Sequence, residues 1–208
     1  MHNKFQKINA FSLAELVIAL GVISILAMIA TPLLSSKKTT AQSIKFKKTY
    51  YTTEQIIKHL ISDSGNYLSD AGFAYTTPIE DEGLTNKFCY WFKTSLNLKK
   101  DYHCPNIGDE GSKLFAQTTD NALWYFYPAD FTISETNFDN KIIVDVNGYE
   151  KPNCLSSNDC EIYKPSAYSC NCSNPDTFII GVRYDGKMNI INDETVIKIL
   201  EDQKSFKE

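Results

Sequence analysis

Apolar and polar positions divide the chain into an N-terminal apolar run and a longer region of mixed character. The run covers residues 16–36 without a charged side chain. At about 1.5 Å of rise per residue, a helix of this length covers the roughly 30 Å hydrocarbon core of a membrane. Glu15 lies at the edge of the run, where an unpaired charge is costly. We therefore expect residues 11–35 to form a transmembrane helix and Glu15 to have a partner.

The positions that follow have the spacing of an amphipathic helix. Mostly apolar residues recur three or four apart, which predicts one face packed on another element. Pro32 is expected to bend the helix near residues 27–31, because it removes a hydrogen bond within the helix. The sequence thus predicts a long N-terminal helix, half of it transmembrane, which ends near residues 63–66. The apolar face consists of Phe46, Tyr50, Thr53, Ile57, Leu60 and Ile61.

Short runs of aromatic and β-branched residues predict strands after a loop expected over residues 66–86. Asp185-Gly186 is a strong hairpin signal between the last two runs. Because the candidate strands are mostly consecutive, we expect a small antiparallel sheet that covers the apolar face of the helix. A short polar helix is expected over residues 194–206, and the predicted fold class is α+β. The candidate strands are residues 87–92, 122–127, 141–146, 177–184 and 187–191.

Six cysteines all lie downstream of the apolar run, which indicates disulfide bonds in an oxidising compartment. Their spacings do not match those of zinc-binding frameworks. We expect Cys89 to pair with Cys104, and two bridges among the other four residues, so that the C-terminal loops are tied by disulfides. A bridge between Cys170 and Cys172 would be strained, and the remaining pairings stay open. The six are Cys89, Cys104, Cys154, Cys160, Cys170 and Cys172.

The start of the chain carries a processing motif. Lys4 and Lys7 precede the apolar run, which is longer than the roughly 7–15 residues of a secretory signal core. Residues 7–27, KINAFSLAELVIALGVISILA, resemble the N-terminus of the type IV pilin and type II secretion pseudopilin superfamily. The resemblance implies that a prepilin peptidase cuts between Ala10 and Phe11, and that Phe11 becomes the N-methylated first residue. Ala10 departs from the glycine that is usual before the cut.

The resemblance also implies a domain organisation and a function. Residues 1–10 are the leader, residues 11–35 the transmembrane and assembly helix, and residues 36–208 an exported pilin-like domain. Glu15 becomes fifth and Pro32 twenty-second in the processed chain, positions that the family fills in the same way. The carboxylate of Glu15 is expected to pair with the amino terminus of a neighbouring subunit, because a paired charge is much less costly in low dielectric.

The implied function is that of a structural subunit of a type IV pilus or a type II secretion pseudopilus. Expected partners are other pilin subunits, the prepilin peptidase, an inner-membrane assembly platform, and the lipid bilayer before assembly. The expected location is the bacterial inner membrane, with a single span and the C-terminus outside, followed by a periplasmic or cell-surface filament. Two alternatives stay open: a minor pilin that binds DNA, a surface or a secreted substrate, and a simple membrane-anchored periplasmic domain.

Composition and motifs argue against other function classes. A net charge of −4 does not favour a general nucleic-acid binder, although a local patch of lysines would still bind one. No nucleophile elbow, phosphate loop or HExxH motif is present, so no enzymatic activity is expected.

One stretch resembles a metal-binding loop. Asp145-Val146-Asn147-Gly148 begins like a calcium loop, but an EF-hand needs Glu at the twelfth position, which is Ser156 here. The resemblance to pseudopilins implies a calcium site in the C-terminal loops instead. A simple turn at Asn147-Gly148 is the alternative. The candidate ligands are Asp145, Asn147, Asp159 and Asp176.

Overall fold

A computed structural model of the chain describes eight stretches and leaves the rest undescribed. It divides into two compact units, residues 1–41 and residues 42–208, which are treated separately below. The described stretches are residues 13–63, 67, 72–73, 86–106, 108–129, 131–170, 172–194 and 196–197.

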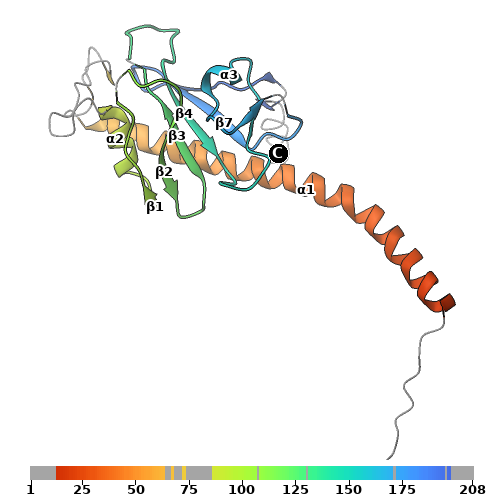
Figure 1. Cartoon of the computed structure of the whole chain (residues 1–208). Helices are drawn as coiled ribbons and strands as arrows, with labels where there is room; N and C mark the ends of the chain where they lie inside the picture. The colour runs from red at the N-terminus through yellow and green to blue at the C-terminus, as the bar shows by residue number, and fades with distance from the viewer. Residues whose placement is uncertain are drawn as a thin grey trace, which may run out of the picture. The chain divides into compact units, whose positions relative to one another are not determined.

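The helix α1 spans Leu13–Ser62 and has 50 residues. In its C-terminal part, which belongs to the second unit, the face with spacings of three and four is buried against the sheet (Figure 1). The ring of Phe46 stacks on Phe178 of the sheet, with 4.1 Å between ring centroids. The hydroxyl group of Thr53, which is also buried, donates to the carbonyl group of Thr49. A polar residue is tolerated on this face because its hydroxyl group bonds within the helix.

Among the described residues, the sheet has eight strands in the order β1-β2-β3-β4-β7-β5-β6, with β8 paired to β7. Neighbours from β1 to β4, and the pairs β4–β7 and β7–β8, are antiparallel. Strand β5 is parallel to both β6 and β7. The strands are β1 Leu98–Asp101, β2 Lys113–Thr118, β3 Leu123–Tyr127, β4 Asn140–Asp145, β5 Cys154–Leu155, β6 Ser169–Cys170, β7 Thr177–Val182 and β8 Met188–Ile190.

The expected fold class is therefore wrong, because the sheet is mixed and larger than the small antiparallel sheet that was predicted. Parallel neighbours need a connection that returns the chain to the same end of the sheet. Here the segment between β5 and β7 makes this connection, and it contains strand β6 and the short helix α3, Cys160–Tyr163. Because β5 and β6 have only two residues each, no hydrophobic period reveals them in the sequence.

The expected membrane span is also corrected. Among the helices that the structure describes, none is long and apolar enough to cross a membrane. Within the apolar run, the continuous stretch of described side chains is residues 16–25.

The aromatic run at residues 87–92, predicted as a strand, belongs to the helix α2, Lys87–Thr94. The side chain of Asn86 accepts a hydrogen bond from the backbone N–H of Cys89 at 3.0 Å, which caps the first turn. Phe88, Cys89 and Phe92 are buried. Their spacing of one and four residues fits one face of a helix, so the strand prediction mistook a short helical pattern for a continuous apolar run.

The predicted hairpin is confirmed. Strands β7 and β8 pair antiparallel, with Ile180 opposite Ile190. Gly186 lies in the connecting turn at φ 79°, a left-handed conformation that favours glycine. Of the polar helix expected over residues 194–206, residues 194, 196 and 197 are described, and they are helical.

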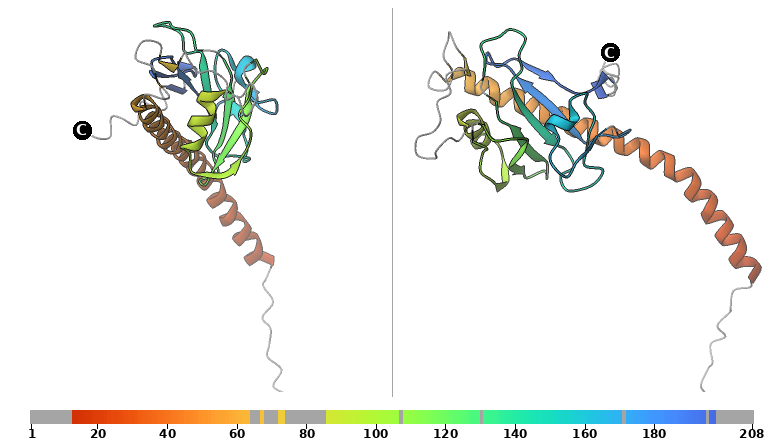
Figure 2. Two further views of the ribbon diagram at one scale, coloured as in Figure 1. Left: turned by 90° about the vertical axis from the view of Figure 1, so that its left-hand side faces the viewer. Right: turned by 45° about the horizontal axis from the view of Figure 1, so that its top comes forward.

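Two hydrophobic clusters lie on opposite faces of the sheet. Trp124, Ile142 and Phe178 belong to the cluster that includes α1 and α2, whereas Tyr125 and Ile143 belong to the cluster that includes α3. Successive residues of a strand point to opposite faces, so the central strands are apolar throughout when both faces are covered. Figure 2 shows the C-terminal part of α1, from residue 42 on, and α3 on the two sides of the sheet.

Candidate functional site: the exposed apolar segment and the C-terminal loops

Residues 16–25 of α1, called the apolar segment below, expose large hydrophobic side chains. Soluble helices normally bury such side chains along one face. Here the exposed fraction of each lies between 51% and 67%. The exposed residues are Leu16, Val17, Ile18, Leu20, Val22, Ile23 and Ile25.

These side chains surround the helix rather than forming one stripe. With about 3.6 residues per turn, Leu16 and Leu20 share one side, while Ile18 and Ile25 lie on the opposite side. Between them, a side-chain carbon added at Gly21 would meet no atom within 4 Å, so the helix has an open notch there. A helix that is apolar on every side needs apolar surroundings on every side.

The polar group in this segment is satisfied internally. The hydroxyl of Ser24 donates to the backbone carbonyl of Leu20 at 2.8 Å. Burying the segment therefore leaves this hydroxyl group with a partner. Full burial of one large apolar side chain is worth about 1.5–3 kcal/mol, so covering these half-exposed side chains would contribute on the order of 10 kcal/mol before ordering costs.

The structure describes neither the residues of the predicted cleavage site nor the side chains of the other predicted assembly residues. Ala10 and Phe11, the predicted cleavage and methylation site, lie outside the described residues. Glu15 and Pro32 lie in α1, but their side chains are outside the described part. Cleavage, methylation and the pairing of Glu15 with a neighbouring amino terminus therefore stay predictions.

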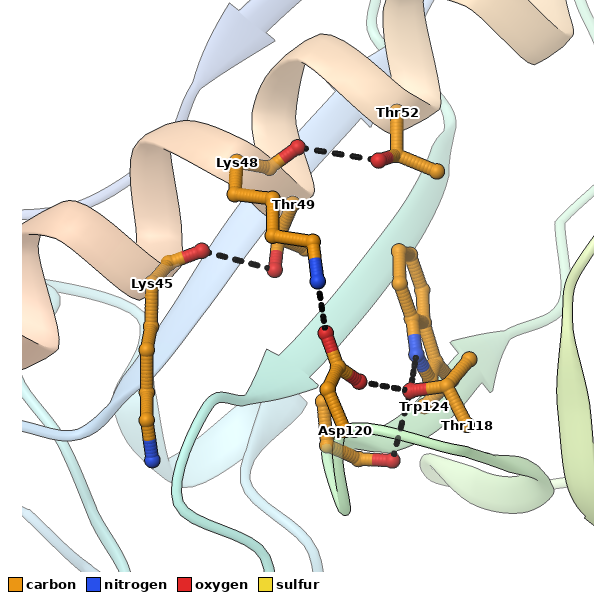
Figure 3. A network of polar contacts seen from close by, with 8 residues as sticks. Lys45, Lys48, Thr49, Thr52, Thr118, Asp120 and Trp124 are labelled. Carbon is orange, nitrogen blue, oxygen red and sulfur yellow. Dashed lines mark hydrogen bonds and ion pairs between the residues drawn. The ribbon is translucent and has the colours of Figure 1, made fainter.

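A polar network joins the C-terminal part of α1 to the hairpin between β2 and β3 (Figure 3). The ammonium of Lys48 lies 2.9 Å from a carboxylate oxygen of Asp120. The hydroxyl of Thr118 donates to the other oxygen at 2.6 Å, and it accepts the indole N–H of Trp124 at 3.1 Å. Burial alone would raise the pKa of Asp120, but the hydrogen bonds from Thr118 and Lys48 outweigh it, and the pKa is lowered. The ion pair between Lys48 and Asp120 is exposed, so it adds little to the buried apolar contacts between the helix and the sheet.

The first calcium candidate, Asp145, is fully buried and bonded by protein donors. One carboxylate oxygen accepts the backbone N–H groups of Asn147 at 3.1 Å and Gly148 at 2.9 Å, while the other accepts the hydroxyl of Tyr168 at 2.5 Å. The pKa of Asp145 is raised to about 7, chiefly by burial; the charge of Asp176 adds to the rise, and the hydrogen bond from Tyr168 opposes it. The contact with Tyr168 could not be read from the sequence, because the two partners lie 23 positions apart.

The second candidate carboxylate, Asp176, accepts hydrogen bonds from the backbone at the start of strand β5. Its oxygens accept the backbone N–H groups of Asn153 at 2.9 Å and Cys154 at 2.7 Å. Asp159 instead precedes helix α3. Among the described residues, no three His, Cys, Asp or Glu side chains form a group that could hold a metal ion. The predicted calcium site therefore gains no support here, and Asp145 and Asp176 act as acceptors that order the loops.

The disulfide predictions are confirmed. Cys89 pairs with Cys104 and ties α2 to the segment after β1. The other four residues form two nested bridges, Cys154–Cys172 and Cys160–Cys170. The outer bridge joins the start of β5 to the segment after β6, and the inner bridge joins α3 to β6. Three disulfides are consistent with an oxidising periplasmic or extracellular location. Comparisons with protein-family models, with curated proteins and with solved structures gave no match to this chain.

Proposed function

We propose that this protein is a structural subunit of a type IV pilus or a type II secretion pseudopilus, and that it joins the filament through the N-terminal part of α1. The observation that carries the proposal is the exposure of the apolar segment on all sides of the helix. Packing against the corresponding helices of other subunits would cover these side chains. The notch at Gly21 would let a neighbouring helix approach closely, as small residues do at helix interfaces.

The processing motif supports the same role. A prepilin peptidase would remove residues 1–10 and leave Phe11 as the N-methylated first residue. The carboxylate of Glu15 would then pair with the amino terminus of a neighbouring subunit and set the register between helices. The second unit would form the outer surface of the filament, where its three disulfides stabilise the fold against an extracellular environment. The proposed role is structural and requires no catalytic group.

A matched pair of substitutions tests the assembly role. Ile18 in the apolar segment and Ile133 in the second unit are similarly exposed, at 67% and 63%. Ile18→Ser should lower the amount of this subunit in sheared filaments at least about tenfold. In the filament Ile18 would be buried, and serine would lose about 2 kcal/mol of its apolar contact. Ile133→Ser should leave incorporation unchanged. Equal incorporation of the two variants would contradict the proposal.

The mass of the mature chain provides a second measurement. Intact-mass analysis of the filament fraction should give a chain that begins at N-methylated Phe11. A chain that retains residues 1–10 would contradict the proposed processing. Glu15→Ala should yield a correctly processed subunit that is absent from filaments, and normal assembly of this variant would overturn the proposed register mechanism.

A further inference from the structure

Two shallow pockets flank β1, the edge strand of the sheet; together they are called the β1 site below. The first has a volume of about 430 Å³. The second, of about 420 Å³, includes Lys99, Lys100, Gln117, Asn147, Tyr149 and Glu150. The hydroxyl groups of Tyr102 and Tyr149, one from each pocket, lie 3.4 Å apart and connect the two. The first pocket is lined by Tyr90, Lys93, Thr94, Asp101, Tyr102 and His103.

Aromatic rings line both pockets. Tyr90 and Tyr102 are half-buried in the first, and Tyr149 in the second is 61% exposed. A tyrosine phenol is neutral at physiological pH, and the hydrogen bond with Tyr102 raises the pKa of Tyr149 further, to about 12. An exposed aromatic ring with a neutral hydroxyl group offers an apolar face together with a hydrogen-bonding edge. Sugar rings have the matching surface, because their C–H faces are apolar and their edges carry hydroxyl groups.

Donors and acceptors line the second pocket together. The carboxylate of Glu150 is an acceptor. The ammonium groups of Lys99 and Lys100 line the same pocket and are donors. A hydroxyl group both donates and accepts, so a polyhydroxylated ligand can satisfy both kinds of group at once.

The charges of the β1 site nearly balance. Lys93 lies 2.8 Å from the carboxylate of Asp101, and Lys99 donates to the amide oxygen of Asn121 at 2.6 Å. Lys100 shares its pocket with Glu150. Three lysines thus face two carboxylates, whereas surfaces that bind nucleic acid carry an excess of positive charge along the backbone path. The balance favours a neutral ligand over a polyanion.

We propose that the β1 site binds a neutral oligosaccharide, which lies across the edge strand with sugar units in both pockets. The rings of Tyr149 and Tyr102 stack on sugar faces, while the carboxylate of Glu150 accepts hydrogen bonds from sugar hydroxyl groups. Lys100 donates to a sugar oxygen. This role is independent of filament assembly, because all of these residues belong to the second unit of the chain.

Binding is tested with the purified full chain, its disulfides intact, on an array of neutral oligosaccharides that includes maltotriose, cellotriose and triacetylchitotriose. The affinity for the best ligand is then measured by calorimetry. Tyr149→Ala should weaken binding at least about tenfold, since the stacked ring supplies both apolar area and geometry. Tyr51→Ala, at a tyrosine of α1 with a similar exposed fraction of 59%, should leave the affinity unchanged.

Several outcomes would overturn the proposal. Failure of every neutral oligosaccharide to bind is one, and equal affinities of wild type and Tyr149→Ala is another. Tighter, salt-dependent binding of a dodecathymidylate strand than of any saccharide would assign the β1 site to nucleic acid instead. Lys100→Ala, an exposed position on the edge strand, provides a second variant and should weaken saccharide binding several-fold. Unchanged thermal unfolding of both variants shows that lost binding is not lost folding.

Discussion

The buried carboxyl group of Asp145 should make the stability of the protein fall as the pH rises. Asp145 is 0% exposed, and burial is the main cause that raises its pKa from 3.8 to about 7. In the unfolded chain the group regains its ordinary pKa. Between the two values the folded protein is protonated at this site and the unfolded chain is not. The stabilising effect of this proton is therefore present below about pH 4 and is lost as the pH rises through about 7.

The structure sets the size of this effect. A difference of about three pKa units corresponds to about 4 kcal/mol, because each unit is worth about 1.4 kcal/mol. About 2.5 kcal/mol of it falls between about pH 5 and about pH 8, where most other carboxyl groups are already ionised. Asp145→Asn removes the titration but keeps an oxygen that can accept the N–H groups of Asn147 and Gly148. Between about pH 5 and about pH 8, the free energy of unfolding of the variant should therefore rise by about 2.5 kcal/mol relative to that of wild type.

Urea unfolding at the two pH values, followed by the fluorescence of Trp91 and Trp124 with the disulfides intact, measures the free energy of unfolding. Asp109→Asn, at an exposed carboxyl group, serves as control and should keep the pH dependence of wild type. If wild type and Asp145→Asn lose stability equally between the two pH values, the carboxyl group of Asp145 is not the titrating group and the reasoning is wrong.

Two further predictions concern stability. Phe46→Ala should lower the free energy of unfolding by about 3–5 kcal/mol, because this ring is 1% exposed and stacks on the sheet. A loss below about 1 kcal/mol in urea unfolding would mean that the ring does not anchor the helix. The double variant Cys160→Ser, Cys170→Ser should lower the free energy of unfolding by about 2–3 kcal/mol, since the bridge joins residues with a sequence separation of 10. An unfolding midpoint equal to that of wild type would contradict this estimate.

Local pattern predicted the elements whose signals lie close together in the chain. The strands β3, β4 and β7 could be predicted, because each is a run of apolar residues buried on both faces. The hairpin was predicted from Asp185-Gly186, since its turn needs a residue with positive φ. Helix α2 was missed although its cap, Asn86, stands in the sequence just before the run. An eight-residue run is short enough for helical and extended patterns to be confused.

The candidate sites differ in how far the sequence predicted them. The apolar segment is continuous in the chain, so its composition alone shows that it needs apolar surroundings. The β1 site is built from segments far apart in sequence, including Tyr90, Tyr102, Gln117 and Tyr149. Neither spacing nor composition relates these residues, so the site could not be predicted. Likewise, the role of Asp145 as a buried acceptor, rather than a calcium ligand, depends on Tyr168.

Residue types and local spacing were enough to predict the apolar segment, the apolar face of the helix and the presence of disulfides. Each depends on residue types or on spacings within a few turns of the chain, which local sterics and hydrophobicity control. The mixed sheet, the nested pairing of Cys154–Cys172 and Cys160–Cys170, and the raised pKa of Asp145 follow from the three-dimensional fold alone. These depend on which distant segments meet and which groups lose contact with water, and a linear pattern does not encode either.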